Sequence, residues 1–171
     1  GVGDRLAHQA PAQLDALLRA AQQGVLIAPV WNKSFREHTI VHSSPRDVRA
    51  EADAACKLRG WKSPYFVDAD HIGLKNVDGF LDSSDFFTLD VAESIGAAPA
   101  ANDLDRFVSK CQKYVGRVSL PGLDMPLEIS PENVRQAGQK FLQAIQEAGE
   151  IYRHIEKAKG AGTFVTEVSF D

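Results

Sequence analysis

The segment from Pro64 to His71 carries an apolar, aromatic run directly into an Asp-x-Asp-His cluster. Side chains alternate along a strand, so Asp68 and Asp70 share one face and His71 follows at the tip. Two carboxylates on one face repel each other unless a positive charge lies between them, and a divalent metal supplies such a charge. Functional groups of parallel α/β proteins gather at the carboxyl ends of strands, so this cluster is a candidate site.

The segments that position this cluster alternate between helical and strand-like patterns. Apolar residues at helical spacing predict helices over about 11–23, 45–60 and 104–111, and a long helix beginning at 131. Apolar and β-branched runs predict strands over 26–31, 65–71, 86–91 and 163–171. A short helix is expected over 72–81, and a loop or small hairpin over 116–129. This alternation indicates parallel strands joined by right-handed crossovers.

The fold class that we predict is α/β, of the (β/α)-barrel type, with parallel strands and crossover helices. Each expected strand ends in polar residues, as strands do at a barrel mouth. These residues are Asn32 and Lys33, Asp70 and His71, Asp90, and the face shared by Glu167, Ser169 and Asp171. Four strands, with a possible fifth near residues 1–5, are too few to close an eight-stranded barrel. We therefore expect one domain over 1–171, a partial TIM-like barrel. The missing initiator Met and the halt at a strand agree with a piece of a longer protein.

Composition excludes several classes of function. With 171 residues and 44% hydrophobic content, the chain is long enough for one core. A net charge of -4 argues against nucleic acid as the partner. No apolar run reaches the roughly 20 residues that a membrane span needs, and no signal peptide opens the chain. Cys56 and Cys111 lie in helix-like segments and are best interpreted as reduced thiols, which fits a cytoplasmic protein.

Five motifs, distributed over the whole chain, resemble the tagaturonate epimerase family of bacterial hexuronate catabolism. They are Gly-Val-Gly-Asp-Arg (1–5), Pro-Val-Trp-Asn-Lys-Ser-Phe-Arg-Glu-His (29–38), Tyr-Phe-Val-Asp-Ala-Asp-His-Ile (65–72), Ser-Asp-Phe-Phe-Thr-Leu-Asp-Val-Ala (84–92) and Phe-Val-Thr-Glu-Val-Ser-Phe-Asp (164–171). The resemblance covers only part of a full family member. It implies a metal-dependent barrel enzyme that interconverts D-tagaturonate and D-fructuronate, and therefore a small sugar-acid substrate.

The implied reaction restricts the chemistry of the site. The two sugar acids differ at a carbinol carbon one removed from the ketone, so direct enolisation does not acidify its C–H bond. One route is retro-aldol cleavage, rotation and re-addition, with a metal stabilising the enediolate. The other is transient oxidation by a nicotinamide. No Gly-x-Gly-x-x-Gly follows an expected strand, and Gly1-Val2-Gly3 is too weak a motif, so a nicotinamide is not indicated.

Four residues are candidates for metal binding and proton transfer. His71 and Glu167 are the expected metal ligands, because imidazole with carboxylate suits Zn, Mn, Ni or Fe(II). Glu167 could instead act as a base. Asp70 could be a ligand, a group that orients a ligating histidine, or a base. Asp90 is a catalytic candidate at the end of its strand, whereas Asp68, deeper in the strand, is expected to be structural.

A hexuronate also needs a positive group to bind its carboxylate. Lys33, Arg36 and His38 follow the first long strand and are candidates for substrate binding, with Arg36 able to bind in bidentate fashion. Asp4 and Arg5 could contribute from a neighbouring strand end. The alternative for all of these is a solvated loop.

Other functions remain open at this point. The chain could be a catalytically inactive piece, or a sugar-acid-binding module that keeps a pocket without turnover. It could also be a metal-dependent aldolase or ketose isomerase on the same barrel, since a retro-aldol epimerase is an aldolase that retains its fragments. Nothing in the sequence predicts an oligomeric state.

Overall fold

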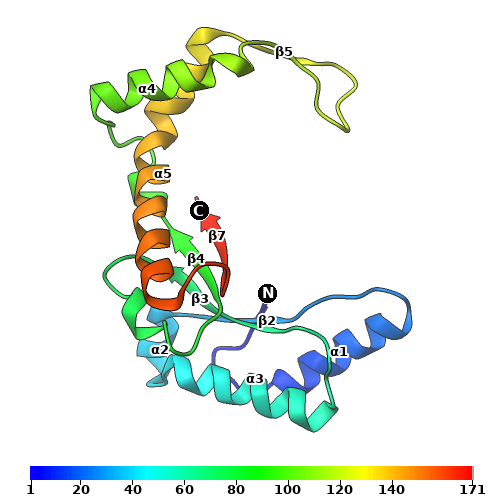
Figure 1. The fold of residues 1–171 in the computed structure, drawn as a ribbon. Helices are drawn as coiled ribbons and strands as arrows, with labels where there is room; N and C mark the ends of the chain where they lie inside the picture. Colours follow the sequence, from blue (N-terminus) through cyan, green and yellow to red (C-terminus); the bar gives the residue numbers. More distant parts are fainter. Residues whose placement is uncertain (171) are drawn as a thin grey trace. The chain divides into compact units, whose positions relative to one another are not determined.

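The computed structural model describes residues 1–170 and contains a five-stranded parallel sheet with the order β1-β2-β3-β4-β7 (Figure 1). Each strand pairs in parallel with its neighbour in this order. The strands are β1 (Val2–Gly3), β2 (Val30–Ser34), β3 (Phe66–Ile72), β4 (Phe86–Asp90) and β7 (Val165–Ser169). The predicted α/β class and the parallel pairing are therefore confirmed.

The helices predicted over 11–23, 45–60 and 104–111 and the long helix from 131 are present. The helices of the structure are α1 (Ala10–Gln22), α2 (Phe35–Val41), α3 (Pro45–Arg59), α4 (Ala101–Cys111) and α5 (Pro131–Lys159). Short 3-10 turns are η1 (Val77–Gly79), η2 (Ala92–Ser94) and η3 (Gln112–Tyr114). The strands β5 (Gly116–Val118) and β6 (Leu127–Ile129) pair in antiparallel orientation, which confirms the expected hairpin.

The prediction of a (β/α) barrel, complete or partial, is wrong. The sheet follows chain order, so β1 and β7 are its two edges, and no strand ladder joins them among the described residues. A barrel requires edge strands that pair with one another, with a matched tilt and stagger. Alternating helices and strands with polar strand ends occur in open parallel sheets as well as in barrels. The sequence pattern therefore could not distinguish closure from an open sheet.

Three elements differ from their predicted positions. Strand β2 begins at Val30 and extends to Ser34, whereas the apolar stretch 25–27 before it is exposed. The helix expected over 72–81 is only the 3-10 turn η1, because the side chain of Asn76 accepts a hydrogen bond from the Gly73 amide and closes a turn. Residues 35–41, expected as a loop, form α2.

The described chain divides into two compact units. The first contains residues 1–90 and 151–169, and the second contains residues 91–150 and Phe170. The whole sheet β1-β2-β3-β4-β7 therefore belongs to the first unit. This division does not test the expected single domain, which stays a prediction.

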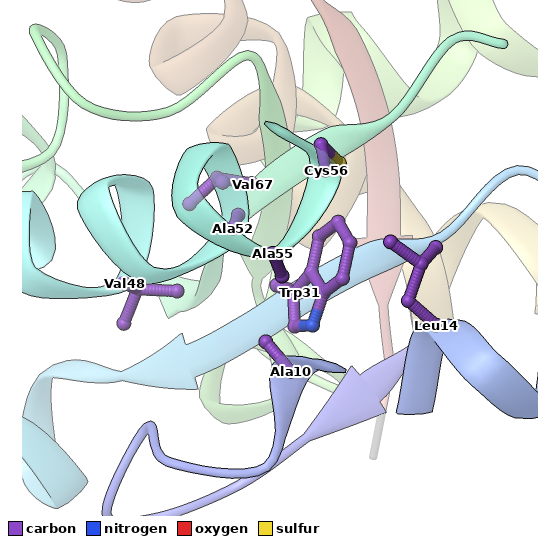
Figure 2. Packing of buried hydrophobic residues seen from close by; sticks show 8 residues of the cluster. All are labelled: Ala10, Leu14, Trp31, Val48, Ala52, Ala55, Cys56 and Val67. Carbon is purple, nitrogen blue, oxygen red and sulfur yellow. The ribbon is translucent and has the colours of Figure 1, made fainter. Parts of the chain in front are cut away.

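The core of the first unit centres on Trp31, which β2 directs toward α1 and α3 (Figure 2). The ring of Tyr65 meets Trp31 edge-on at 6.0 Å, and the indole N–H donates to Gln13 Oε1 at 3.0 Å. Small side chains on α3 let that helix approach the sheet closely. The buried cluster contains Ala10, Leu14, Trp31, Val48, Ala52, Ala55, Cys56 and Val67. Both cysteine thiols, Cys56 and Cys111, are free, as predicted.

A second aromatic group lies where the end of α5 meets the sheet. Phe164 contacts Phe87 of β4 at 5.7 Å and Tyr152 of α5 at 5.5 Å, measured between ring centroids. Trp31, Ala69 and Phe87 occupy the same face of the sheet by register and are buried. This face is therefore the helix-covered one, and polar residues are concentrated on the other.

In the second unit, α4 packs on the first part of α5 through Gly138. A Cβ at this position would lie 2.7 Å from both Leu104 Cδ1 and Phe107 Cδ1, so a larger residue would force these side chains to shift. Among the described residues, no helix is both long and apolar enough to cross a membrane.

Candidate functional site

A cleft of about 410 Å³ lies at the carboxyl ends of β2, β3 and β4. Its lining residues are Ser34, Phe35, Arg36, His71, Asn76 and Asp90. Carboxyl ends of parallel strands are the usual location of ligand sites in open α/β sheets. Three residues predicted from the sequence, Arg36, His71 and Asp90, therefore meet in one place.

The first wall of the cleft is formed where β2 passes directly into α2. Ser34 caps α2: its hydroxyl accepts from the Glu37 amide at 3.3 Å, and Glu37 Oε2 accepts from the Ser34 amide at 3.1 Å. This reciprocal capping box fixes where the helix starts. Phe35 and Arg36 consequently stand in the first turn, both exposed at the cleft.

The second wall depends on a bulge in β3 at His71. Ala69 pairs with Phe87, but Ile72 pairs with Leu89, so one residue of β3 is extra at this point. His71 has φ of 51°, a left-handed conformation uncommon for a non-glycine residue. With plain alternation, His71 would share the helix-covered face with Ala69. The bulge instead buries Ile72 and turns His71 to the cleft.

His71 and Asp90 form the titratable pair of the cleft. His71 Nδ1 lies 3.5 Å from Asp90 Oδ2, and both side chains are roughly two-fifths exposed. A carboxylate at Nδ1 favours the tautomer with the proton on that nitrogen and orients the ring. The other nitrogen, Nε2, is then the one that can accept a proton or bind a metal.

A row of acidic residues lies on the sheet face opposite the helices. Register places Asp70 beside Ser34, and Glu167 beside Thr88. Asp68 is buried and accepts hydrogen bonds from the Thr88 amide at 3.1 Å and the Thr88 hydroxyl at 2.9 Å. Burial raises the pKa of Asp68 to about 6, and the charges of Asp70 and Glu167 act in the same direction.

The imidazole and carboxylate groups near the cleft are suitable ligands for a divalent metal, but too few of them lie together in the described part of the chain to hold one. Imidazole and carboxylate are suitable ligands for the metals predicted. Within residues 1–170, however, no three His, Cys, Asp or Glu side chains are close enough together to hold an ion. His71 and Asp90 are an adjacent pair, while Asp70 and Glu167 lie elsewhere on the same polar side of the sheet. Asp171 lies outside the described residues.

The other predicted substrate-binding residues do not line the cleft. Lys33 and His38 are buried, and both hydrogen-bond to Ser43. Arg5 forms an ion pair with Glu37, at 3.6 Å, behind the α2 cap. Asp4 accepts from the backbone amides of residues 6, 8 and 9 and so organises the turn before α1.

Ser34, Phe35 and Asn76 line the cleft without having been predicted. The first two could have been found from the Ser-x-x-Glu spacing of residues 34–37, which is the signature of a capped helix. Asn76 has no comparable sequence signature, because its role depends on the turn between β3 and β4.

The chain is an α/β protein with an open parallel sheet and a polar, charged cleft at its strand ends, which is where open α/β sheets usually hold ligand sites. The chain belongs to the tagaturonate epimerase (UxaE) family, whose sequence profile matches residues 1–171. No curated protein sequence matches it.

Solved structures with a similar fold carry the same family name. A glycerol-complexed crystal structure of fructuronate-tagaturonate epimerase from Cohnella laeviribosi has a TM-score of 0.72 and 22% sequence identity. The match covers 99% of this chain and 36% of that one. The native crystal structure of that enzyme gives 0.70 and 20%, with coverage of 97% and 36%. The likeness shows a shared fold, and this chain spans about a third of the length of those enzymes.

Proposed function

We propose that the protein containing this chain is an isomerase that interconverts D-tagaturonate and D-fructuronate. One observation carries the proposal: three family motifs, 29–38, 65–72 and 84–92, each contribute a charged or titratable residue to one cleft. These residues are Arg36, His71 and Asp90. Substrate and reaction come from the family, and the cleft is where this chain would take part.

Arg36 is the residue best suited to bind the carboxylate of the sugar acid. Its guanidinium offers parallel N–H donors that match a carboxylate, and it lines the cleft beside Ser34 and Asn76. The hydroxyl of Ser34 and the amide of Asn76 are suited to sugar hydroxyl groups. This arrangement would hold the acid end of the substrate at α2 and its carbon chain toward β3 and β4.

His71 and Asp90 are suited to proton transfer. Asp90 Oδ2 lies 3.5 Å from His71 Nδ1 and orients the imidazole for proton transfer. In a retro-aldol route, a base removes a proton from one substrate hydroxyl as the carbon–carbon bond breaks. The same group returns that proton after the aldehyde rotates and the bond forms again. His71 Nε2 can perform both steps while it holds no metal, and Glu167 is the base when His71 is a metal ligand.

A divalent metal remains part of the proposal, with Zn, Mn, Ni or Fe(II) as candidates. His71, Asp70 and Glu167 are the ligands that the sequence predicts, and the carboxylate-rich face supports them by chemical type. When bound, the metal would act as a Lewis acid toward the substrate oxygens. A cytoplasmic location is also proposed, supported by the two free thiols.

The test is product analysis with the full-length protein and D-tagaturonate. Proton NMR should detect D-fructuronate approaching an equilibrium mixture with no net formation of three-carbon products. Accumulation of trioses would identify an aldolase instead. Ligand-dependent thermal stabilisation without any product would identify a binding module and contradict the proposal.

A further inference from the structure

Lys33 and His38 are buried and form a polar cluster with the half-buried Ser43. Lys33 Nζ donates to Ser43 Oγ at 2.8 Å, and Ser43 Oγ lies 2.9 Å from His38 Nδ1. Lys33 is 1% exposed and His38 is 5% exposed. Lys33 pairs in register with buried Ala69, so it lies on the helix-covered side of the sheet.

The protonation states fit these hydrogen bonds. Burial, reinforced by the charge of Lys33, lowers the pKa of His38 from 6.5 to about 4, so the ring is neutral near pH 7. A neutral Nδ1 can accept the Ser43 hydroxyl proton while Ser43 Oγ accepts from Lys33. Ser43 therefore hydrogen-bonds to both buried groups at once.

Burying a polar cluster of this kind stabilises the fold less than burying apolar side chains would. A buried ammonium group loses its hydration, and apolar residues of similar volume are often at least as stabilising. Burial also lowers the pKa of Lys33, which the more distant charges of Glu37, Asp4 and Asp47 only partly oppose. A contribution to folding stability therefore does not explain why the Lys33–His38–Ser43 cluster is present. Buried polar networks can instead hold neighbouring groups in one geometry.

The segment that this cluster holds is α2. Lys33 immediately precedes the cap residue Ser34, His38 lies within the helix, and Ser43 follows its left-handed end at His42. The cluster therefore contacts the chain before, within and after a helix of only 7 residues. A helix this short has little stability of its own. Its first turn carries Arg36 into the cleft.

We infer that Lys33, His38 and Ser43 are positioning residues, which fix α2 and thereby direct the Arg36 guanidinium at the carboxylate of the sugar acid. The cluster acts through Arg36 and does not touch the substrate itself. The inference rests on the proposed function for the identity of that anion, whereas the holding of α2 can be measured without any substrate.

The experiment compares Ser43→Val with Ser43→Thr in the full-length protein. Valine and threonine have nearly the same shape, but valine carries a methyl group where threonine carries a hydroxyl. Hydrogen exchange should be faster by at least about tenfold at the amides of residues 36–40 in Ser43→Val, and close to wild type in Ser43→Thr. Amides of β3 and β4 should be unchanged in both. Should Ser43→Val fail to fold, Ser43→Val with Lys33→Met removes the buried charge and serves instead.

The kinetic part of the experiment separates positioning from a general structural effect. Ser43→Val should raise KM for D-tagaturonate on the order of tenfold, with kcat changed less than about twofold. In an Arg36→Ala background the same substitution should leave KM unaltered. Equal exchange in the Val and Thr variants, or an unchanged KM despite faster exchange, would overturn the inference. Absence of turnover in the wild type would instead refute the proposed function, and the exchange data would still decide whether the cluster holds α2.

Discussion

His71 faces Asp90 because β3 contains an extra residue at that point. The bulge shifts the register between Ala69 and Ile72, and it leaves His71 Nδ1 at 3.5 Å from Asp90 Oδ2 on the next strand. A second His–Asp pair, His154 with Asp78, has a closer approach of 2.6 Å and links α5 to η1, and neither of its residues lines the cleft. The two pairs therefore provide a matched comparison between a candidate catalytic His–Asp pair and a surface His–Asp pair.

Arg36→Lys should weaken substrate binding in the full-length enzyme. Lysine keeps the charge but loses the two parallel N–H donors, so KM for D-tagaturonate should rise on the order of tenfold. Steady-state kinetics measure this change. Arg46→Lys is the control, since Arg46 forms an exposed ion pair with Asp82. Equal KM values for the two variants would remove Arg36 from substrate binding.

Asp85→Ala should destabilise the sheet. Asp85 Oδ1 accepts from the Val67 amide at 2.7 Å, and its other oxygen pairs with Arg49 Nη2 at 2.8 Å. Removing the carboxylate leaves the Val67 amide unsatisfied and breaks one of several contacts of Arg49, so the free energy of unfolding should fall by about 2 kcal/mol. Urea unfolding measures it. Asp82→Ala, which breaks only an exposed pair, should cost less than about 0.5 kcal/mol; similar losses in both would contradict the assignment.

Stability should depend on the protonation of His38. Its pKa is about 4 in the folded state against 6.5 when unfolded, so only the unfolded state gains a proton between these values. Protonation thus favours unfolding, and stability falls as pH decreases from 6.5 toward 4. At pH 5 the cost is about 2 kcal/mol, at about 1.4 kcal/mol per pKa unit.

His38→Gln removes this titration while keeping a group that can bond to Ser43. Its unfolding free energy should fall less between pH 7 and pH 5 than that of the wild type, by about 2 kcal/mol. The carboxylates that titrate in the same pH range affect the unfolding free energy of both proteins equally, so their effect cancels in the comparison. Parallel pH profiles in urea unfolding would show that His38 is not held neutral by burial.

Metal removal should abolish epimerisation if the proposed ligands are correct. Dialysis of the full-length protein against a chelator should reduce turnover by at least about a hundredfold, and one of the four candidate metals should restore it. Glu167→Gln should also lower the metal content measured by mass spectrometry. Full activity in metal-free protein would refute the metal part of the proposal.

The sequence located strands β3, β4 and β7 better than it located β2 or the local geometry at the strand ends. Alternation in 65–71 correctly placed Asp68 and Asp70 on one face, because that pattern is local. The bulge at His71 depends on pairing with β4, so no local pattern could predict it. Lys33 was expected to bind substrate, because it follows the predicted strand 26–31. Its burial depends on partners, His38 and Ser43, that lie further along the chain. Closure of the sheet was predicted wrongly, since polar strand ends occur in open sheets too.

The most direct test of the candidate site compares His71→Ala with His154→Ala in the full-length protein. The measurement is kcat/KM for conversion of D-tagaturonate to D-fructuronate, with thermal unfolding to confirm that both variants fold. Loss of at least about a hundredfold in His71→Ala, against a change below about twofold in His154→Ala, is the predicted result. Equal activity of the two variants would contradict the claim that the cleft at the ends of β2, β3 and β4 performs the reaction.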